Sequence, residues 1–435
     1  MMRRIFSDYA YGNGPRAGCW WDETIAAPDW PVAAGDIRAD VAIVGGGFTG
    51  MSAALHLAEN GVSVAVFEAE APGWGASGRN GGFCCLGGSK LSDAQKRRRY
   101  GAEGTRAFDE AEKEAVQLAA SLIERYGIVA DTHSRGETQL AHNARAMDAL
   151  RRQADAGHGR LHEKHDLASE GLNGEFHGGL TSDVGFALNP RKYLFGLAAA
   201  ATGSGARMFR NSPVIRIEQG ARGHVLDTPL ARVEADTVLI CTNGYSSEDM
   251  PPWLAGRYMP AQSSVMVTRP LTEAELQAQG WTSDQMAYDT RNLLHYFRLM
   301  PDRRFLFGMR GGLLSSPRSE AGIRVRLRRH FDTMFPAWTG VEATNLWSGM
   351  VCLSRALMPY VGPVPGSPGL FAGLAYHGNG VAMGTYSGRA LARLALGADP
   401  GLPQAMQAPL TRFPLGRFRR AIMPPVYLVL GLGDL

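Results

Sequence analysis

The sequence is poor in lysine and cysteine and has no long hydrophobic run. The last of its lysines is Lys192, so the C-terminal half offers no amine for Schiff-base or proton-transfer chemistry. The 5 cysteines are odd in number and scattered, which excludes a disulfide framework, and no C-x-x-C pair indicates zinc. No apolar stretch approaches the roughly 20 residues that cross a bilayer. We therefore predict neither a metal site nor a membrane span.

The charge balance is modest. The 435 residues carry a formal net charge of +4, and 45% of them are hydrophobic. This composition is typical of a globular protein and does not indicate a nucleic-acid partner. The first residues include two arginines but no apolar run, so we expect no secretory signal and predict a cytoplasmic location.

Residues 39–70 read as a strand, a glycine-rich turn, a helix and a second strand. Gly45, Gly47 and Gly50 fit the pattern G-x-G-x-x-G between the first strand and the helix. The first glycine permits a tight turn, the second lets the backbone approach a pyrophosphate, and the third lets helix and strand pack closely. We therefore expect this turn, with Phe48 and Thr49, to bind a dinucleotide at the helix N-terminus.

Glu68 ends the second strand and is followed by Ala69. A carboxylate at this position accepts hydrogen bonds from ribose hydroxyls and repels a 2′-phosphate, which favours FAD or NAD over NADP. A nicotinamide enzyme usually continues into another crossover helix. Here the chain continues into GWGASGRNGGFCC (73–85), a loop with many backbone donors and one cation, Arg79, and this favours FAD.

Further motifs are GGGFTG, FEAE, GWGASGRNGG, ICTNGYS and AYHGNGVAMG. Together they make the chain resemble the D-amino-acid-oxidase-type FAD oxidoreductases over residues 10–400. The resemblance is closest to the gamma-glutamylputrescine oxidase branch, with glycine and sarcosine oxidases as more distant relatives. It implies an α/β fold (α+β overall) in which a Rossmann-like FAD-binding domain is interleaved with a smaller mixed-sheet substrate domain.

The resemblance also implies specific cofactor contacts. In this family the loop after the acidic strand wraps the flavin and the pyrophosphate, and an arginine there can offset phosphate charge. A later turn precedes a helix whose N–H groups would point at the flavin. The implied contacts are Gly75, Ala76, Ser77, Arg79, Asn80, Gly81 and Gly82 in the loop, Val214 at the adenine, Thr242, Asn243 and Gly244 in a second turn, and Gly378, Asn379, Gly380 and Val381 before the helix.

Three residues are candidates for contact with the substrate. Strand alternation places Tyr296 and Arg298 on one face of the stretch LHYFRLM, where the resemblance suggests that they hold a carboxylate or polar tail. A solvent-facing pair is the alternative. His377 precedes the glycine turn but is displaced by one residue from the G-H-G of relatives, which leaves its role open.

The resemblance implies oxidation of an amine or amino acid, such as a gamma-glutamylputrescine-like compound, by hydride transfer to FAD with oxygen as the final acceptor. One alternative is a dehydrogenase that passes electrons to a quinone or carrier, because the strand FLFGMR lacks the lysine that sarcosine oxidases are thought to use with oxygen. Another is a flavin-binding protein whose substrate site has decayed. We expect non-covalent FAD, with Cys352 a buried thiol rather than an attachment point, and no disulfide between Cys84 and Cys85.

The predicted organisation is discontinuous. We expect an N-terminal arm at 1–37, an FAD-binding domain at 38–130, 186–250 and 346–400, a substrate domain at 131–185 and 251–345, and a C-terminal tail at 401–435. Helices are predicted after a capping box at Ser92 and after the pair Asn189–Pro190. In the tail, arginines precede an apolar run, and we favour packing on the body over contact with a membrane interface.

Overall fold

The first sheet is built around the predicted dinucleotide strand. A computed structural model describes residues 3–434. Five strands are parallel, in the order β18-β11-β1-β2-β8, and β17 pairs antiparallel with β18 at one edge. Parallel strands end at one edge of the sheet, so the turns after β1, β2 and β11 meet there. The bounds are β1 Gly35–Val44, β2 Val64–Phe67, β8 Arg207–Phe209, β9 Arg216–Gln219, β10 His224–Asp227, β11 Ala231–Ile240, β17 Tyr360–Pro363 and β18 Leu370–Leu374.

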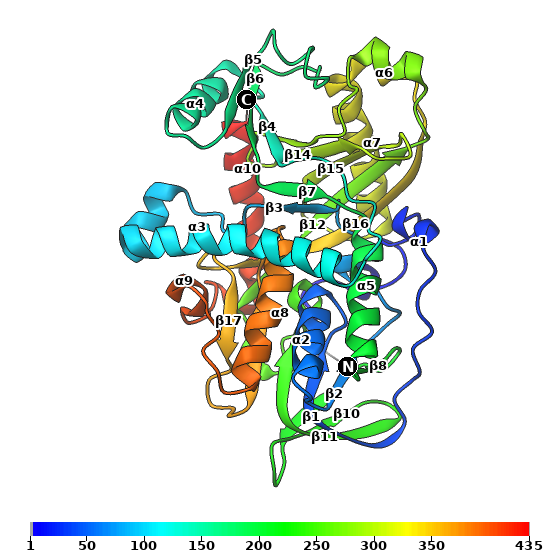
Figure 1. The fold of residues 1–435 in the computed structure, drawn as a ribbon, viewed down its shortest axis with the longest axis vertical. Coiled ribbons are helices and arrows are strands. Elements are labelled where there is room, and N and C mark those ends of the chain that lie inside the picture. The colour runs from blue at the N-terminus through cyan, green and yellow to red at the C-terminus, as the bar shows by residue number, and fades with distance from the viewer. Residues whose placement is uncertain (1–2, 435) are drawn as a thin grey trace.

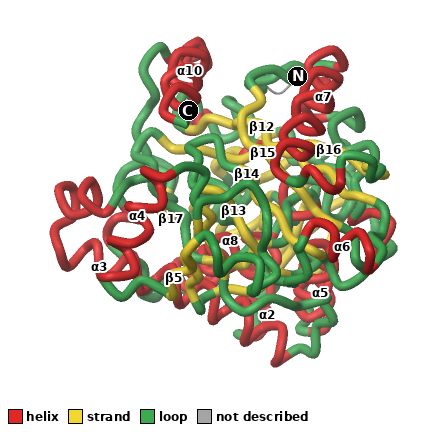
Figure 2. Tube along the Cα trace, turned by 90° about the horizontal axis from the view of Figure 1, so that it is seen from above, coloured by secondary structure: helices red, strands yellow, loops and turns green. Residues whose placement is uncertain are grey.

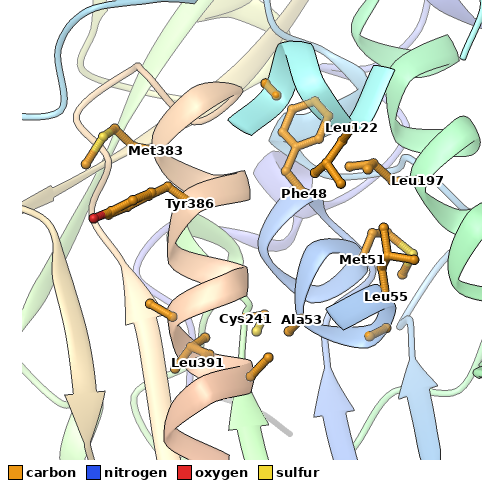
Figure 3. Packing of buried hydrophobic residues seen from close by; sticks show 14 of the residues in the cluster. Phe48, Met51, Ala53, Leu55, Leu122, Leu197, Cys241, Met383, Tyr386 and Leu391 are labelled. Atoms are coloured by element: carbon orange, nitrogen blue, oxygen red, sulfur yellow. The ribbon is translucent and has the colours of Figure 1, made fainter. Parts of the chain in front are cut away.

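Helices α2, α5 and α8 lie along one face of this sheet, and the long helix α3 crosses their ends (Figure 1). The dinucleotide helix α2 lies between α5 and α8, and Phe48, Met51 and Leu55 of α2 are fully or almost fully buried there (Figure 3). The predicted capping box at Ser92 and the Asn189 cap are both confirmed. The bounds are α2 Phe48–Glu59, α3 Asp93–Arg125, α5 Pro190–Gly203 and α8 Ala382–Ala395.

The second sheet is mixed and also has eight strands, in the order β16-β12-β15-β14-β13-β4-β6-β5. All of its pairs are antiparallel except β13 with β4. An aromatic core that includes Trp281, Phe297 and Phe335 packs between this sheet and helix α7. The bounds are β4 Glu137–Leu140, β5 Arg160–Glu163, β6 Gly178–Ser182, β12 Tyr258–Thr268, β13 Met286–Asp289, β14 His295–Leu299, β15 Phe305–Gly312, β16 Ala343–Ser354, α4 Ala144–Asp155, α6 Glu273–Gln279 and α7 Pro317–Met334.

The two sheets are connected closely in sequence and in space. A two-stranded sheet of β3 (Phe83–Cys85) and β7 (Gly185–Ala187) lies between them in Figure 1. Strand β1 begins at Gly35, inside the segment that we predicted as the arm, and β16 crosses the predicted boundary at 345/346 while pairing throughout with β12. The predicted combination of a Rossmann-like sheet and a mixed sheet is confirmed, whereas the exact domain limits stay predictions.

The C-terminal tail is anchored by polar contacts. Arg419 is fully buried, forms a 2.7 Å ion pair with Glu248, and donates a 2.8 Å hydrogen bond to the carbonyl of Tyr258. Helix α10 (Met423–Gly433) follows at the rim of the molecule (Figure 2) and leaves large apolar side chains exposed, among them Leu428 and Val429. Among residues 3–434, no helix combines the length and apolarity that crossing a bilayer requires.

Candidate active site

A long cavity opens where the parallel strands of the first sheet end. It encloses about 1430 Å³, including the part open to solvent, and is lined by turns that follow β1, β2 and β11. The predicted site residues that line it are Gly45, Gly47, Phe48, Thr49, Glu68, Ala69, Gly75, Ala76, Ser77, Asn80, Val214, Thr242, Asn243, His377, Gly378, Gly380 and Val381.

The glycines of the first turn leave no room for a side chain. Gly45 has φ +106°, and a Cβ there would lie 2.8 Å from the carbonyl oxygen of Cys241. A Cβ on Gly50 would lie 2.0 Å from the carbonyl oxygen of Gly45, although Gly50 itself does not line the cavity. Gly47 faces the Ser77 hydroxyl, which accepts a 3.0 Å hydrogen bond from the amide of Phe48. The turn therefore presents bare backbone at the N-terminus of α2.

Glu68 is held by the backbone around it. Its two carboxylate oxygens accept hydrogen bonds from the amides of Gly46 (2.9 Å) and Glu70 (3.1 Å). Burial raises the pKa of this carboxyl above its usual range. The carboxylate lines the cavity close to Val214, an arrangement that suits a ribose bound between β2 and the β8–β9 connection.

Other polar atoms in the wall fit a polyhydroxylated, phosphorylated ligand. The Tyr245 and Ser247 hydroxyl oxygens and the Arg4 Nε are buried and have no hydrogen-bond partner among residues 3–434. All three side chains line the cavity. Since unpaired buried polar atoms cost free energy, a ligand that carries phosphates and hydroxyls, such as FAD, would satisfy them. Sequence patterns did not reveal Arg4, because it lies in the arm, far from every motif.

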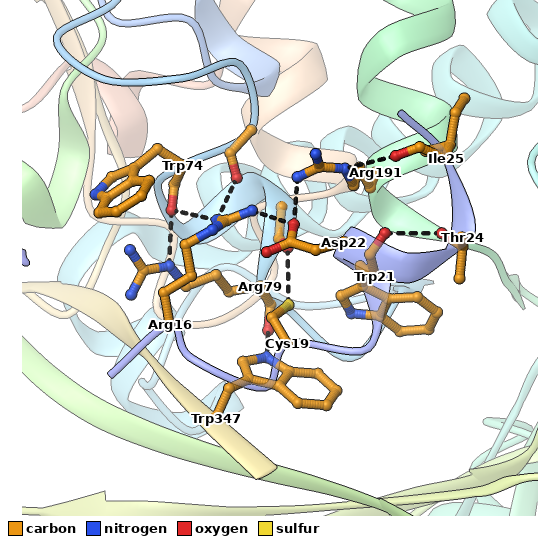
Figure 4. Close-up of polar contacts among 12 residues, drawn as sticks. Arg16, Cys19, Trp21, Asp22, Thr24, Ile25, Trp74, Arg79, Arg191 and Trp347 are labelled. Atoms are coloured by element: carbon orange, nitrogen blue, oxygen red, sulfur yellow. Dashed lines mark hydrogen bonds and ion pairs between the residues drawn. The ribbon is translucent and has the colours of Figure 1, made fainter. Parts of the chain in front are cut away.

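The loop at 73–85 carries Arg79 to a different place from the phosphate site that we expected. Its guanidinium is buried and donates to the carbonyl oxygens of Trp74 (2.7 Å) and Ser348 (3.2 Å), as Figure 4 shows for Trp74. Its Nη2 has no partner among the described residues, and the side chain lines a second cavity rather than the first.

The N-terminal arm clamps this loop (Figure 4). The Arg16 guanidinium donates 2.9 Å hydrogen bonds to the carbonyl oxygens of Gly73 and Trp74. Asp22 pairs with both Arg16 and Arg191 of α5, so its carboxylate ties the arm to this helix. The Trp21 indole donates a 2.8 Å hydrogen bond to the carbonyl of Asn80. The arm is thus part of the site.

We expect Asp22→Ala to weaken FAD binding about tenfold or more, because it leaves Arg16 and Arg191 without their shared carboxylate and loosens the loop. Fluorescence titration of apoprotein with FAD measures this affinity. The matched control is Asp29→Ala, since exposed Asp29 also pairs with an arginine, Arg210, away from the loop. Equal FAD affinities for the two variants would contradict a role for the arm.

The second cavity adjoins the first. It encloses about 1080 Å³ with its open part, and both cavities are lined by Ala76, Asn80, Met350, Val351 and Gly378. Strands β4, β12, β13, β14 and β15 supply much of the remaining wall. Of the other predicted contacts, Gly81 and Asn379 line this second cavity, whereas Gly82 and Gly244 line neither.

The three candidate catalytic residues have different surroundings. Tyr296 lines the second cavity, where its hydroxyl lies 3.1 Å from that of Ser263. Arg298 lines neither cavity. It is buried and donates to the carbonyl oxygens of Gly81 (3.1 Å) and Leu188 (2.8 Å), which ties the loop at 73–85 to Leu188. Burial lowers the Arg298 pKa to about 9.

His377 forms part of the backbone frame of the site. One ring nitrogen lies 2.8 Å from the Gly88 carbonyl oxygen, and the other accepts a 3.2 Å hydrogen bond from the Ser354 amide. Burial lowers the pKa of this imidazole to about 3, so the ring is neutral. With both nitrogens engaged, His377 has a positioning role in this arrangement.

Three charged residues that sequence reasoning missed line the second cavity: Lys90, Glu137 and Arg310. Arg310 is the last residue of the stretch FLFGMR, in which we had looked for a lysine, and it lies inside strand β15. Lys90 reaches the same cavity from the loop after β3. Lys90 keeps exposed surface, but the protein around its ammonium group and the charge of Arg310 lower the Lys90 pKa to about 7. Burial raises the Glu137 pKa to about 8. Glu137 opens a short strand in a stretch without a recognisable pattern, so no sequence signal marked it.

The cysteines match the expectation of unpaired thiols. All five are free and buried. Cys352 lines the first cavity, and burial raises its pKa to about 12, so the thiol stays protonated at neutral pH. Cys84 of β3 is fully buried in the same core as α2, α3, α5 and α8, and Cys85 lines the second cavity. Non-covalent FAD binding stays a prediction.

Comparisons with known proteins agree with this geometry. Residues 40–394 match the family of FAD dependent oxidoreductases designated DAO. The chain is 31% identical to the probable oxidoreductase OrdL of Rhizobium meliloti, over 93% of this chain and 94% of that protein. It is 30% identical to the gamma-glutamylputrescine oxidoreductase of Escherichia coli K12, over 88% and 90% of the two chains. The crystal structure of glycine oxidase from Geobacillus kaustophilus superposes with a TM-score of 0.71 at 22% identity, covering 86% of this chain and 100% of that one. The chain therefore belongs to the DAO family of FAD-dependent oxidoreductases.

Proposed function

We propose that this enzyme oxidises an amine or amino acid that carries a carboxylate, and that the substrate binds in the second cavity. The main support for this proposal is that the two cavities meet at Asn80 and Gly378. Arg310 and Tyr296 line the second cavity, which is the proposed substrate site. The Arg310 guanidinium packs against Gly378, where an added Cβ would lie 2.2 Å from Nη2. Its side chain forms no ion pair within 4.0 Å among the described residues, so a substrate carboxylate is a suitable partner.

FAD, when bound, supplies a two-electron acceptor that takes a hydride from the carbon beside a neutral amine. The protein's part is binding, orientation and exclusion of water. Arg310 fixes the carboxylate, while the Tyr296 ring packs edge-to-face against Phe83 at a centroid distance of 5.6 Å and makes one wall apolar. Loss of a hydride and of the amine proton yields an imine, which water converts to a carbonyl compound and the free amine or ammonia.

Helix α8 contributes to the other side of the junction. It begins at Ala382, directly after Gly380 and Val381, which line the first cavity. The positive end of this helix faces the first cavity, and it would stabilise negative charge on a reduced flavin bound there by about 0.3–2 kcal/mol. This role needs only backbone N–H groups, so it does not depend on the displaced His377.

The test is anaerobic reduction of the bound flavin by a panel of amines and amino acids, with and without carboxylates. We expect loss of the absorbance of oxidised flavin with carboxylate-bearing members, and release of a carbonyl product. Retention of oxidised flavin with every compound would contradict the proposal and support a flavin-binding protein with a decayed substrate site.

The electron acceptor is proposed to be oxygen, with a quinone or carrier as the second candidate. The exposed apolar side chains of α10 favour the second candidate, since a membrane-located acceptor requires an apolar contact surface. Stopped-flow mixing of reduced enzyme with air-saturated buffer distinguishes them. Reoxidation faster than turnover supports an oxidase, whereas slow reoxidation that a soluble quinone analogue accelerates supports a dehydrogenase.

A further inference from the structure

The outer face of helix α10 consists of apolar residues. A helix on a protein surface normally turns charged and polar side chains towards solvent. In α10, by contrast, Leu428, Val429 and Leu432 are 65%, 67% and 61% exposed. At about 3.6 residues per turn these three positions lie on one side of the helix. Every exposed residue of α10 is a proline, a valine, a leucine or a glycine, so this face gains nothing from contact with water.

Polar contacts on both sides of α10 fix the helix with this face outwards. Before the helix, buried Arg419 pairs with Glu248. At its end, the Asp434 carboxylate accepts hydrogen bonds from the amides of Asn292 (2.6 Å) and Leu293 (3.1 Å). The residues on the opposite face are buried or half-buried: Met423, Tyr427 and Leu430. The helix is therefore held on the body, and the exposure of its outer face does not come from a detached tail.

The apolar surface extends into the segment before α10. The 3-10 helix η6 (Gly416–Ile422) contacts α10, and Phe418 of η6 and the preceding Leu415 are also exposed. Single exposed apolar side chains are usual on protein surfaces, whereas a cluster of them marks an interaction surface. Of the 13 exposed large hydrophobic residues in the described part of the chain, six lie within residues 415–432 and are called the tail patch here: Leu415, Phe418, Val426, Leu428, Val429 and Leu432.

The segment that carries the tail patch is basic. Residues 400–433 contain four arginines and no acidic residue. Of these arginines, Arg412 and Arg417 are exposed, and neither forms an ion pair within 4.0 Å among residues 3–434. The Arg417 guanidinium lies over the ring of Phe418, 4.6 Å from its centroid. Exposed Arg355 adds a third such charge, and it donates a 3.2 Å hydrogen bond to the carbonyl of Arg412. Positive charge thus accompanies the apolar surface.

We propose that the tail patch and these arginines dock the enzyme on the surface of a membrane that contains anionic lipids. The apolar side chains enter the boundary between head groups and acyl chains, and the arginines bind lipid phosphates. The sequence favours packing of this tail on the body, and the inner face of α10 packs in that way, whereas its outer face is the part that meets the membrane.

A second copy of the chain fits the tail patch less well than a membrane. It would bring the same arginines to the interface, with no acidic residue in 400–433 to pair with them. An anionic lipid surface supplies both the apolar layer and the negative charge. The proposal concerns where the enzyme binds, so it holds for any amine substrate and for oxygen or a quinone as acceptor.

The test is flotation of the FAD-loaded protein with lipid vesicles. One set of vesicles contains phosphatidylcholine mixed with phosphatidylglycerol, and the other contains phosphatidylcholine alone. We expect the wild-type protein to bind the mixed vesicles about tenfold or more tightly than the neutral ones. Added salt should reduce this preference, because it screens the attraction between arginines and lipid phosphates. Light scattering without vesicles gives the oligomeric state of the same samples.

The apolar contribution is tested by Leu428→Ser combined with Val429→Ser. This double variant should lower the affinity for the mixed vesicles about tenfold or more, because two side chains that would leave water on docking lose their apolar surface. The matched control is Val129→Ser combined with Leu230→Ser, since both residues are also exposed but lie outside the tail patch. The control should bind vesicles like the wild type. All four side chains are exposed, so FAD content and thermal unfolding should stay unchanged in both double variants.

The contribution of charge is tested by Arg412→Gln combined with Arg417→Gln. This variant keeps the tail patch and removes two positive charges. It should lower the affinity for the mixed vesicles about tenfold and change the affinity for neutral vesicles about twofold or less.

Wild-type protein that binds neither kind of vesicle, or that binds both kinds equally, would overturn the inference. So would equal vesicle affinities for the wild type and for Leu428→Ser combined with Val429→Ser. A wild-type dimer that binds no vesicles, and that this double variant dissociates, would assign the tail patch to a second copy of the chain instead. No measurement here requires turnover, so failure of this inference is distinct from failure of the proposed function.

Discussion

Replacing Arg310 by methionine is expected to lower kcat/KM for carboxylate-bearing amines about 100-fold or more. Arg310 lies in the second cavity beside Gly378 and has no acidic partner among residues 3–434, so the substrate carboxylate is the group that it would pair with. Loss of one member of a buried, hydrogen-bonded charge pair typically costs about 2–5 kcal/mol. Steady-state kinetics on carboxylate-bearing and carboxylate-free amines of equal length measure the effect.

Three comparisons separate this binding role from damage to the fold. Arg310→Lys keeps the charge but not the two-pronged geometry and should have an intermediate kcat/KM. Arg326→Met removes one arginine from the exposed surface of α7 and should match the wild-type enzyme. FAD content should be unchanged in Arg310→Met, because Arg310 does not line the first cavity. An equal loss on substrates with and without the carboxylate would contradict the assignment.

Replacing Gly50 by alanine is expected to weaken FAD binding about tenfold to 100-fold and to lower the free energy of unfolding. The added Cβ would lie 2.0 Å from the carbonyl oxygen of Gly45, a backbone atom that cannot rotate away, and 3.3 Å from a methyl carbon of Ile43. Helix α2 would have to separate from β1, and such overpacking typically costs about 1–3 kcal/mol. The two effects are measured separately. The ratio of flavin to protein absorbance and FAD titration measure FAD binding, and thermal unfolding of the apoprotein measures stability.

Gly203→Ala is the matched control for this substitution. Gly203 ends helix α5, and an added Cβ there meets nothing within 4 Å. Since alanine has the higher helix propensity, this variant should bind FAD normally and be at least as stable as the wild type. Stoichiometric FAD with unchanged affinity in Gly50→Ala would show that close packing of this turn is not required.

The cofactor half of the site was largely predictable, because its chemistry is local. The turn at Gly45–Gly50 and the Glu68 carboxylate lie at the ends of consecutive strands. The backbone geometry required there limits which residues fit, and this limit is visible as a pattern of adjacent residues in the sequence. The sequence also indicated the mixed second sheet and the strand that holds Tyr296. It did not indicate that β16 continues across the expected boundary at 345/346, since strand pairing with β12 depends on residues about 80 positions away.

The second cavity, which we propose as the substrate site, could not be predicted from the sequence and was decided by the tertiary structure. Tyr296 and Arg298 share a face of β14 as alternation requires, yet only Tyr296 reaches the cavity, because the Arg298 guanidinium is taken up by the carbonyl groups of Gly81 and Leu188. Arg310, Lys90 and Glu137 come from three separate segments, and no spacing rule connects them.

The loop GWGASGRNGGFCC illustrates the division. Its glycines and its position after Glu68 indicated FAD from the sequence alone, since backbone donors and close approach are properties of the residues themselves. Where Arg79 points depends on the Ser348 carbonyl of β16, far along the chain, and the clamp that Arg16 and Asp22 place on the loop comes from an N-terminal arm nearly 60 residues earlier. Local backbone chemistry was therefore determined by the sequence pattern, whereas the partners of each charged side chain were decided only when the fold brought distant segments together.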